Sequence, residues 1–121
     1  MTTPATSAAP HFVVDTRRSG TTEVVEVRGE VDIATAPLLR AVLETVVGRR
    51  PTRVEVDLSG TTFMDAHALT TLSAVRRRLA SRHATLVVRR PSPVVERLLE
   101  LTEAEHSFEI VTGSAGVRRA G

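Results

Sequence analysis

The chain has 121 residues and contains no cysteine, lysine, tyrosine or tryptophan. Without cysteine it has no disulfides, no thiolate nucleophile and no cysteine-based metal site. Tyr, Trp and Phe together make up only 2% of the residues, which requires an aliphatic core and leaves no aromatic platforms for stacking single-stranded nucleic acid. We expect neither a metal nor another cofactor.

All 16 basic residues are arginine, against 14 acidic residues, so the formal net charge is only +2. The high sequence pI of 10.8 follows from the missing lysine and tyrosine, because nothing titrates between histidine and arginine. The arginines gather at 49–50 and at 76–78 with Arg82. A solvated helix face accounts for these clusters better than a DNA-binding surface, so no direct nucleic-acid partner is expected.

No apolar run approaches the roughly 20 residues that a membrane-spanning helix needs. The start of the sequence has no basic segment followed by an apolar one, as a secretion signal would. We therefore expect a cytoplasmic protein without membrane insertion. Its length suits one domain with one core.

Apolar spacing predicts an α/β fold, in which a mixed sheet of about five strands is packed by three to four helices. The strands are expected over 12–14, 23–27, 54–58, 84–88 and 107–111. The helices are expected from the cap Thr35 to Gly48, over 66–81, and from the pair Ser92-Pro93 onward. We expect a disordered leader over 1–10, one domain over 11–112 and a loose tail over 113–121.

The stretch 54–69 is the centre of this pattern. It begins as an alternating strand, with the apolar residues Val54, Val56 and Leu58 on one face and Glu55 and Asp57 on the other. We expect Ser59-Gly60 to break the strand, Phe63 and Met64 to turn inward, and a helix to start just after Asp65. A strand that feeds a helix through a short polar loop exposes backbone N–H groups at the helix N-terminus, where proteins bind anions or partners.

Three blocks of this sequence resemble the STAS domain, the fold of bacterial anti-sigma-factor antagonists. VDLSGTTFMDAHAL over 56–69 resembles the family run Asp-Leu-Ser-Gly-x-x-Phe-x-Asp-Ser-Ser/Thr-Gly-Leu. GEVDIATAPLL over 29–39 and SPVVERLLELT over 92–102 resemble two further blocks of the family, in the family's order. The resemblance covers about residues 11–112 and implies the STAS fold.

The resemblance also implies a function. Such antagonists bind an anti-sigma factor, in many cases a serine kinase, and thereby free a sigma factor for transcription. The second hydroxyl residue of the family run is the one that the kinase phosphorylates, and the added charge separates the complex. His67, flanked by Ala66 and Ala68, occupies that position here. Control by serine phosphorylation is therefore expected to be lost at the usual site.

Three interpretations of His67 stay open: a polar surface residue, a contact to a constitutive partner, or a phosphoryl acceptor itself. The first two are favoured about equally, and nothing in the sequence favours the third. Thr70 and Thr71 are alternative, shifted acceptors, although a threonine inside a helix more often packs or bonds to the backbone.

Asp32 matches an aspartate of the family that lies on the kinase-docking surface. An equally good interpretation is that Asp32 merely bounds the following helix. The predicted partner-binding residues are Asp32, Ser59, Gly60, Thr61, Thr62, Met64, Asp65, Ala66, His67, Ala68, Leu69 and Thr70.

The chain shows no sign of an enzyme. Its four histidines are scattered, and no nucleophile or phosphate-binding motif is present. Asp65 and His67 are two residues apart at a helix start, where side chains do not normally face each other. A second function class stays open, because STAS domains also occur as subunits of membrane-transporter ATPases and as small-ligand-binding or sensor modules. A homodimer is compatible with the sequence.

Overall fold

The computed structural model describes residues 4–112 and 116–118. Its strands are β1 (Thr6–Ala9), β2 (Phe12–Ser19), β3 (Thr22–Val31), β4 (Arg53–Met64), β5 (Thr85–Arg89), β6 (Glu109–Thr112) and β7 (Gly116–Arg118). Its helices are α1 (Ala36–Gly48), α2 (Ala66–Ala80) and α3 (Pro93–Leu101), followed by the short 3-10 turn η1 (Ala104–His106).

All seven described strands form one sheet, in the order in which they occur along the chain. β1, β2 and β3 are antiparallel neighbours, β3 to β6 are parallel, and β7 returns antiparallel to β6. Helices α1, α2 and α3 make the crossovers between the parallel strands, as parallel pairing requires. The predicted mixed α/β fold is confirmed.

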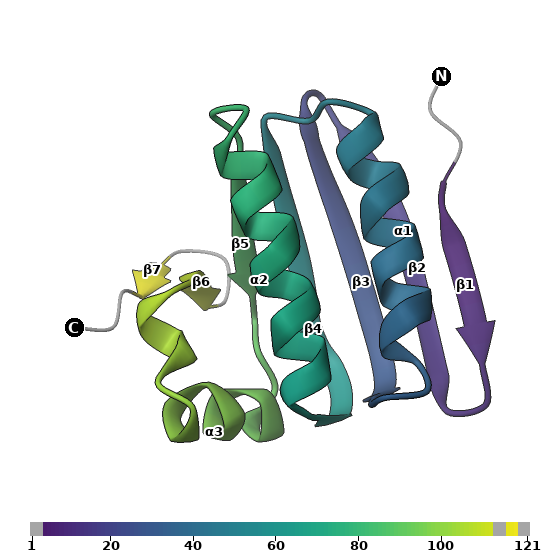
Figure 1. The fold of residues 1–121 in the computed structure, drawn as a ribbon, viewed down its shortest axis with the longest axis vertical. Helices are drawn as coiled ribbons and strands as arrows, with labels where there is room; N and C mark the ends of the chain where they lie inside the picture. The colour runs from purple at the N-terminus through teal and green to yellow at the C-terminus, as the bar shows by residue number, and fades with distance from the viewer. Residues whose placement is uncertain (1–3, 113–115, 119–121) are drawn as a thin grey trace.

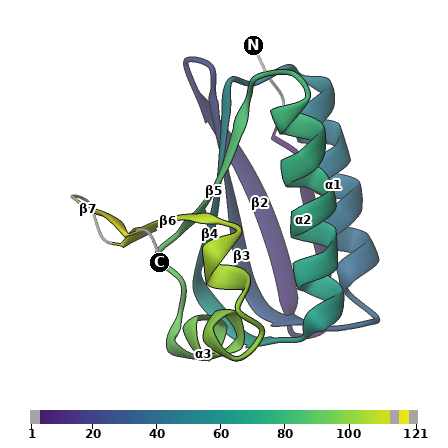
Figure 2. The ribbon, with the colours of Figure 1, turned by 60° about the vertical axis from the view of Figure 1, so that its left-hand side comes forward.

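Helices α1 and α2 lie side by side on one face of the sheet (Figure 1). The rotated view shows both on the same side, with α3 near the end of the sheet where α2 begins (Figure 2). We call the face opposite α1 and α2 the helix-free face. No helix among the described residues is long and apolar enough to span a membrane.

The core lies between the sheet and helices α1 and α2, with Val95 and Leu99 of α3 also part of it. It is aliphatic, as the low aromatic content required. Its largest fully buried side chains include Leu39, Leu43, Leu58, Leu72, Leu79, Leu86 and Leu99. Phe12 and Phe108 are the buried aromatic residues within the described part of the chain. The predicted inward alternation of Val54, Val56 and Leu58 is confirmed, since all three are 0% exposed.

Two strands were not predicted. Residues 6–9 fall in the expected disordered leader, yet they form β1, in which Ala9 pairs with Phe12 and Thr6 pairs with Asp15. The backbone N–H of Ala5 also donates to Thr16 Oγ1 at 2.7 Å. This segment is held by hydrogen bonds of its backbone. Its side chains are small and show no alternation of apolar and polar residues, so the sequence did not indicate a strand here. Within the expected tail, residues 116–118 form β7; residues 1–3, 113–115 and 119–121 lie outside the described residues.

Two features hold the start of the sheet in place. Glu23 is fully buried on β3, where Arg18 Nη1 lies 2.8 Å and Arg49 Nη1 3.5 Å from its carboxylate. Gly29 has φ +95°, and a Cβ built there would lie 2.0 Å from the carbonyl oxygen of His11. The close approach lets Glu30 N donate to that same oxygen at 2.7 Å. Only glycine fits at position 29.

Candidate functional site

β4 is longer than the sequence pattern predicted. It continues through Ser59-Gly60 to Met64, and only Asp65 separates it from α2. The expected break and polar loop are wrong, because a bulge absorbs this segment: Asp57 pairs with Glu26, but Gly60 pairs with Arg28, so two residues of β4 oppose one of β3.

A second irregularity decides where Phe63 points. Gly29 pairs with Thr61 and Glu30 with Phe63, so Thr62 is an extra residue in β4. Met64 is buried, as predicted, but Phe63 is 46% exposed, which corrects the prediction that both turn inward. The extra residue changes the alternation of side chains along the strand.

Asp65 caps α2. Its backbone is extended, with φ −120° and ψ −177°, and its Oδ1 accepts from the backbone N–H of His67 at 2.9 Å. In the same side-chain conformation, Oδ2 of Asp65 lies 3.4 Å from Nδ1 of His67. The expectation that these two side chains would not face each other is therefore wrong, because it assumed that both residues are helical. The His67 side chain remains 57% exposed.

Asp32 organises the turn before α1. Its Oδ1 accepts from the backbone N–H groups of Ala34 at 2.9 Å and Thr35 at 3.0 Å. Thr35 stands at the cap position, as predicted, but its hydroxyl accepts from Asp32 N and donates to the Glu30 carbonyl oxygen instead of bonding to the helix. The pKa of Asp32 lies below its ordinary value, chiefly because its carboxylate accepts the hydrogen bond from the backbone N–H of Thr35. Burial acts in the opposite direction but is outweighed. Asp32 thus does bound the helix.

The two turns meet at one edge of the sheet. Val31 and Met64 are partners across β3 and β4, and Asp65 N donates to the Val31 carbonyl oxygen at 3.2 Å. Parallel strands end together, so the residues that follow them gather at that edge. We call this surface the carboxyl edge; it consists of Glu30, Asp32, Ile33, Phe63, Asp65 and His67.

Two apolar side chains of the carboxyl edge were missed from the sequence. Ile33 is 68% and Phe63 is 46% exposed, and the acidic residues Glu30, Asp32 and Asp65 accompany them. Large exposed apolar side chains beside polar ones mark interaction surfaces. Nothing in the local sequence distinguishes Phe63 from a core residue, since its exposure depends on the extra residue in β4.

The other predicted partner-binding residues, and Thr71, which was predicted only as a shifted acceptor, differ in burial. Thr61, Met64, Ala68 and Leu69 are buried and support the carboxyl edge from beneath. Ser59, Thr62, Ala66 and Thr70 are exposed, and Gly60 and Thr71 are half-buried. The Thr70 hydroxyl donates to the Ala66 carbonyl oxygen at 3.0 Å, within the helix.

A polar cluster that the sequence did not reveal lies on the helix-free face. Asp57 is only 2% exposed; its Oδ1 accepts from Ser59 N at 2.9 Å and Ser59 Oγ at 2.7 Å, and its Oδ2 accepts from Arg90. Burial alone would raise the pKa of Asp57, but the bonds from Arg90 and Ser59 and the charge of Arg90 outweigh it and lower the pKa.

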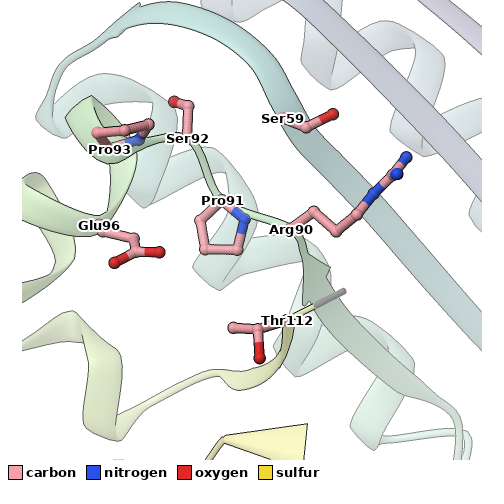
Figure 3. A pocket seen from close by; sticks show the side chains of 7 residues that line it. All are labelled: Ser59, Arg90, Pro91, Ser92, Pro93, Glu96 and Thr112. Atoms are coloured by element: carbon pink, nitrogen blue, oxygen red, sulfur yellow. The ribbon is translucent and has the colours of Figure 1, made fainter. Parts of the chain in front are cut away.

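An open hollow of about 390 Å³ adjoins this cluster at the start of α3. The Arg90 side chain points toward Ser59 and away from Glu96 and Thr112 (Figure 3). Its guanidinium group is paired with the carboxylate of Asp57. Ser92 Oγ also donates to the Thr61 carbonyl oxygen at 2.6 Å. These bonds fasten the β5–α3 connection to β4, which is a structural role.

Comparison with known protein families gives one match over most of the chain. The family model described as Mlab, STAS domain, matches residues 14–112. Among curated proteins none matches this sequence.

Several solved structures share the fold. An anti-sigma factor antagonist from Mycobacterium paratuberculosis is 27% identical with a TM-score of 0.79, over 88% of this chain and 91% of that one. The Bacillus cell fate determinant SpoIIAA is similar in its unphosphorylated form, at 19% identity and a TM-score of 0.71, over 82% of this chain and 88% of that one. Its phosphorylated form gives 18% identity and 0.64, over 82% and 91%. At these identities the SpoIIAA likeness establishes the fold alone.

Proposed function

The chain belongs to the STAS domain family, and we propose that it is a cytoplasmic anti-sigma-factor antagonist-like regulator. It binds an anti-sigma factor by protein–protein contact and thereby releases a sigma factor, without catalysis. The observation that carries this proposal is the likeness, over nearly the whole of both chains, to an anti-sigma factor antagonist at 27% identity.

The carboxyl edge is the docking surface in this proposal. Ile33 and Phe63 are exposed apolar side chains, which are the kind of residue that anchors a protein interface when a partner pocket covers it. Glu30, Asp32 and Asp65 surround them with negative charge. The complementary partner therefore presents an apolar pocket rimmed by arginine or lysine.

We further propose that partner binding is constitutive. SpoIIAA exists in a phosphorylated and an unphosphorylated form. In this chain the family's acceptor position, within the run Ala66-His67-Ala68, carries no hydroxyl. The Thr70 hydroxyl donates a hydrogen bond to the Ala66 carbonyl oxygen within the helix, and Thr71 is half-buried. Neither threonine is therefore a good replacement for the missing phosphoryl acceptor.

The test is a pull-down with the purified chain as bait in a lysate of its own organism, followed by incubation of any identified anti-sigma factor with the chain and ATP. Recovery of an anti-sigma factor without transfer of phosphate is the expected result. Transfer to Thr70, Thr71 or His67 would refute constitutive binding and leave the antagonist function intact. If no anti-sigma factor is recovered under conditions in which both proteins are expressed, the antagonist proposal fails.

The name of the matching family model supports a second candidate. It is named for Mlab and not for the antagonists, and STAS domains also serve as small subunits of membrane-transporter ATPases. Recovery of a transporter ATPase in place of an anti-sigma factor would establish this alternative.

A further inference from the structure

Long charged side chains cover part of the helix-free face of the sheet. Val25 and Val27 of β3 belong to the core on the helix side, so the alternation along the strand turns Val24 to the helix-free face. Val24 is only 6% exposed, although α1 and α2 lie on the other face. Its partners on the neighbouring strands are Arg17 of β2 and Glu55 of β4, whose aliphatic stems take the place of a helix as its cover.

Most arginines of the helix-free face have a carboxylate partner. The ion pairs there are those of Arg28 with Asp15, Arg53 and Arg89 with Glu55, and Arg90 with Asp57. Arg17 is the exception, because it is exposed and has no ion pair or side-chain hydrogen bond among the residues that the structure describes. Its partner on β3 is Val24, which carries no charge. The Arg17 guanidinium is therefore available to a ligand.

Arg17 borders an open hollow of about 470 Å³ near the turn between β2 and β3. The hollow is lined by Arg17, Ser19, Thr22, Val24, Glu55 and Arg89. The strand register places Arg17 opposite Val24 and Val24 opposite Glu55, so these side chains share the helix-free face. Arg18 also borders the hollow, but its guanidinium bonds to the buried carboxylate of Glu23 at 2.8 Å.

Positive charge exceeds negative charge around this hollow. Glu55 contributes a carboxylate, and both oxygens of that group are engaged, Oε2 by Arg53 at 2.8 Å and Oε1 by Arg89 at 3.2 Å. The three arginines Arg17, Arg53 and Arg89 thus accompany one carboxylate, which leaves an excess of two positive charges (3 − 1). A hollow with such an excess concentrates anions.

A further carboxylate on this face, that of Glu26, lies outside the hollow. Glu26 is two residues beyond Val24 on β3, toward the carboxyl edge. The pKa of Arg90 is raised, chiefly by its hydrogen bond with Asp57, and the charge of Glu26 contributes to the same shift. The charge of Glu26 thus acts on an arginine that does not line the hollow.

We propose that this hollow binds a phosphate monoester group. Such a group carries roughly two negative charges at neutral pH, which matches the excess of positive charge. The planar donor arrays of Arg17 and Arg89 suit phosphate oxygens, and the hydroxyls of Ser19 and Thr22 supply further donors. The volume falls within the roughly 300–1,000 Å³ of small-molecule pockets, so the organic part of the ester has room above Val24.

This site is independent of partner docking at the carboxyl edge. Val24 and Val31 lie seven residues (31 − 24) apart on β3, which corresponds to roughly 20 Å. Figure 1 shows the turn between β2 and β3 at the opposite end of the sheet from α3.

The test is a titration of the ¹⁵N-labelled chain with glycerol phosphate at constant ionic strength, followed by NMR. Saturable shifts are expected at the amides of residues 17–19 and 22–24. Acetate, a monoanion, should bind at least about tenfold more weakly, and glycerol should not bind. Sedimentation with phosphatidylcholine vesicles, with and without phosphatidic acid, identifies the source of the group. Binding that requires phosphatidic acid assigns it to a lipid headgroup, and binding of glycerol phosphate alone assigns it to a soluble ester; both results support the site.

Variants of opposite expected effect test the residues. Arg17→Gln should weaken glycerol phosphate binding by about tenfold or more, whereas Arg40→Gln, at an exposed site on α1, should leave it unchanged. Glu55→Gln removes the negative charge at the hollow and should strengthen binding by about threefold or more. Melting curves check that each variant is folded; Arg17→Gln breaks no ion pair and decides the matter if Glu55→Gln is unstable. The proposal is overturned if glycerol phosphate gives no saturable shifts, if acetate binds as tightly, or if Arg17→Gln binds as well as the parent chain.

Discussion

The backbone N–H of Asp65 donates to the carbonyl oxygen of Val31 across 3.2 Å, which joins the end of β4 to the end of β3. Asp32 follows the end of β3 and His67 follows the end of β4, so the pairing of the two strands holds both residues at the same edge of the sheet. Any partner that docks at the carboxyl edge meets a surface fixed by backbone pairing, so its shape does not depend on contacts between the exposed side chains.

Replacing Asp65 with alanine should destabilise the fold by about 1 kcal/mol, because the first turn of α2 loses its capping carboxylate. Asparagine caps helices as well as aspartate does, so Asp65→Asn should be nearly neutral. Urea denaturation of both variants measures the difference. Equal losses in the two would show that charge next to His67, and not the cap, is what matters.

Glu23→Gln should reduce the free energy of unfolding by about 3 kcal/mol. The buried carboxylate contacts two half-buried guanidinium groups, those of Arg18 and Arg49, and the substitution removes the negative charge that both of them face. Glu100→Gln, at an exposed site on α3, is the matched control and should be close to neutral. A loss of less than about 1 kcal/mol for the Glu23 variant would mean that the arginines find other partners.

Gly29→Ala should destabilise the protein by about 3 kcal/mol or more, because the new Cβ would overlap the His11 carbonyl oxygen and φ would remain positive. Gly48→Ala gives the contrast. It lies at the end of α1 with nothing within 4 Å of its Cβ position, so alanine should stabilise the helix by up to about 0.5 kcal/mol. Thermal unfolding of the two variants checks both signs.

The dependence of stability on pH should involve Asp57. Its pKa is lower in the folded than in the unfolded chain, so its contribution is complete above the ordinary aspartate pKa, about 4, and disappears as the pH falls through the folded value. Asp57→Asn should therefore flatten the fall in unfolding free energy between about pH 5 and pH 2.

The control for this measurement is Asp15→Asn, which removes an exposed carboxylate paired with Arg28. Its pH profile should stay close to that of the parent chain. If the Asp57 and Asp15 variants give the same profile, the acid sensitivity comes from other carboxylates, and the Asp57–Arg90 pair has no part in it.

The sequence was informative wherever side-chain periodicity reflects burial. Alternation identified Val54, Val56 and Leu58 as core residues, and the motif blocks identified a fold family that the comparisons confirm. It failed where backbone geometry decides the outcome. The pairing of residues 6–9 depends on hydrogen bonds of the main chain, and the small side chains of this segment have no pattern that predicts those bonds.

The candidate site shows the same division. Asp32 and Asp65 were found because they belong to motif blocks, but Phe63 was assigned to the core because the extra residue at Thr62 does not show in the hydrophobic pattern. The Asp57–Arg90 pair joins residues 33 positions apart, so no local pattern contains it. Long-range ion pairs and bulges are properties of the assembled sheet.

The exposure of Phe63 gives the most direct test of the docking surface. Phe63→Ala should weaken binding of the anti-sigma factor by about 30-fold, or about 2 kcal/mol, as expected of an aromatic anchor at an interface. Ile33→Ala should weaken it by a smaller factor. Leu101→Ala should leave it unchanged, because Leu101 is as exposed as Ile33 but lies on α3, away from the carboxyl edge. Calorimetric titration measures all three, and thermal unfolding confirms that each variant is folded. If Phe63→Ala has no effect, or if Leu101→Ala weakens binding as much as Phe63→Ala does, the partner does not dock at the carboxyl edge.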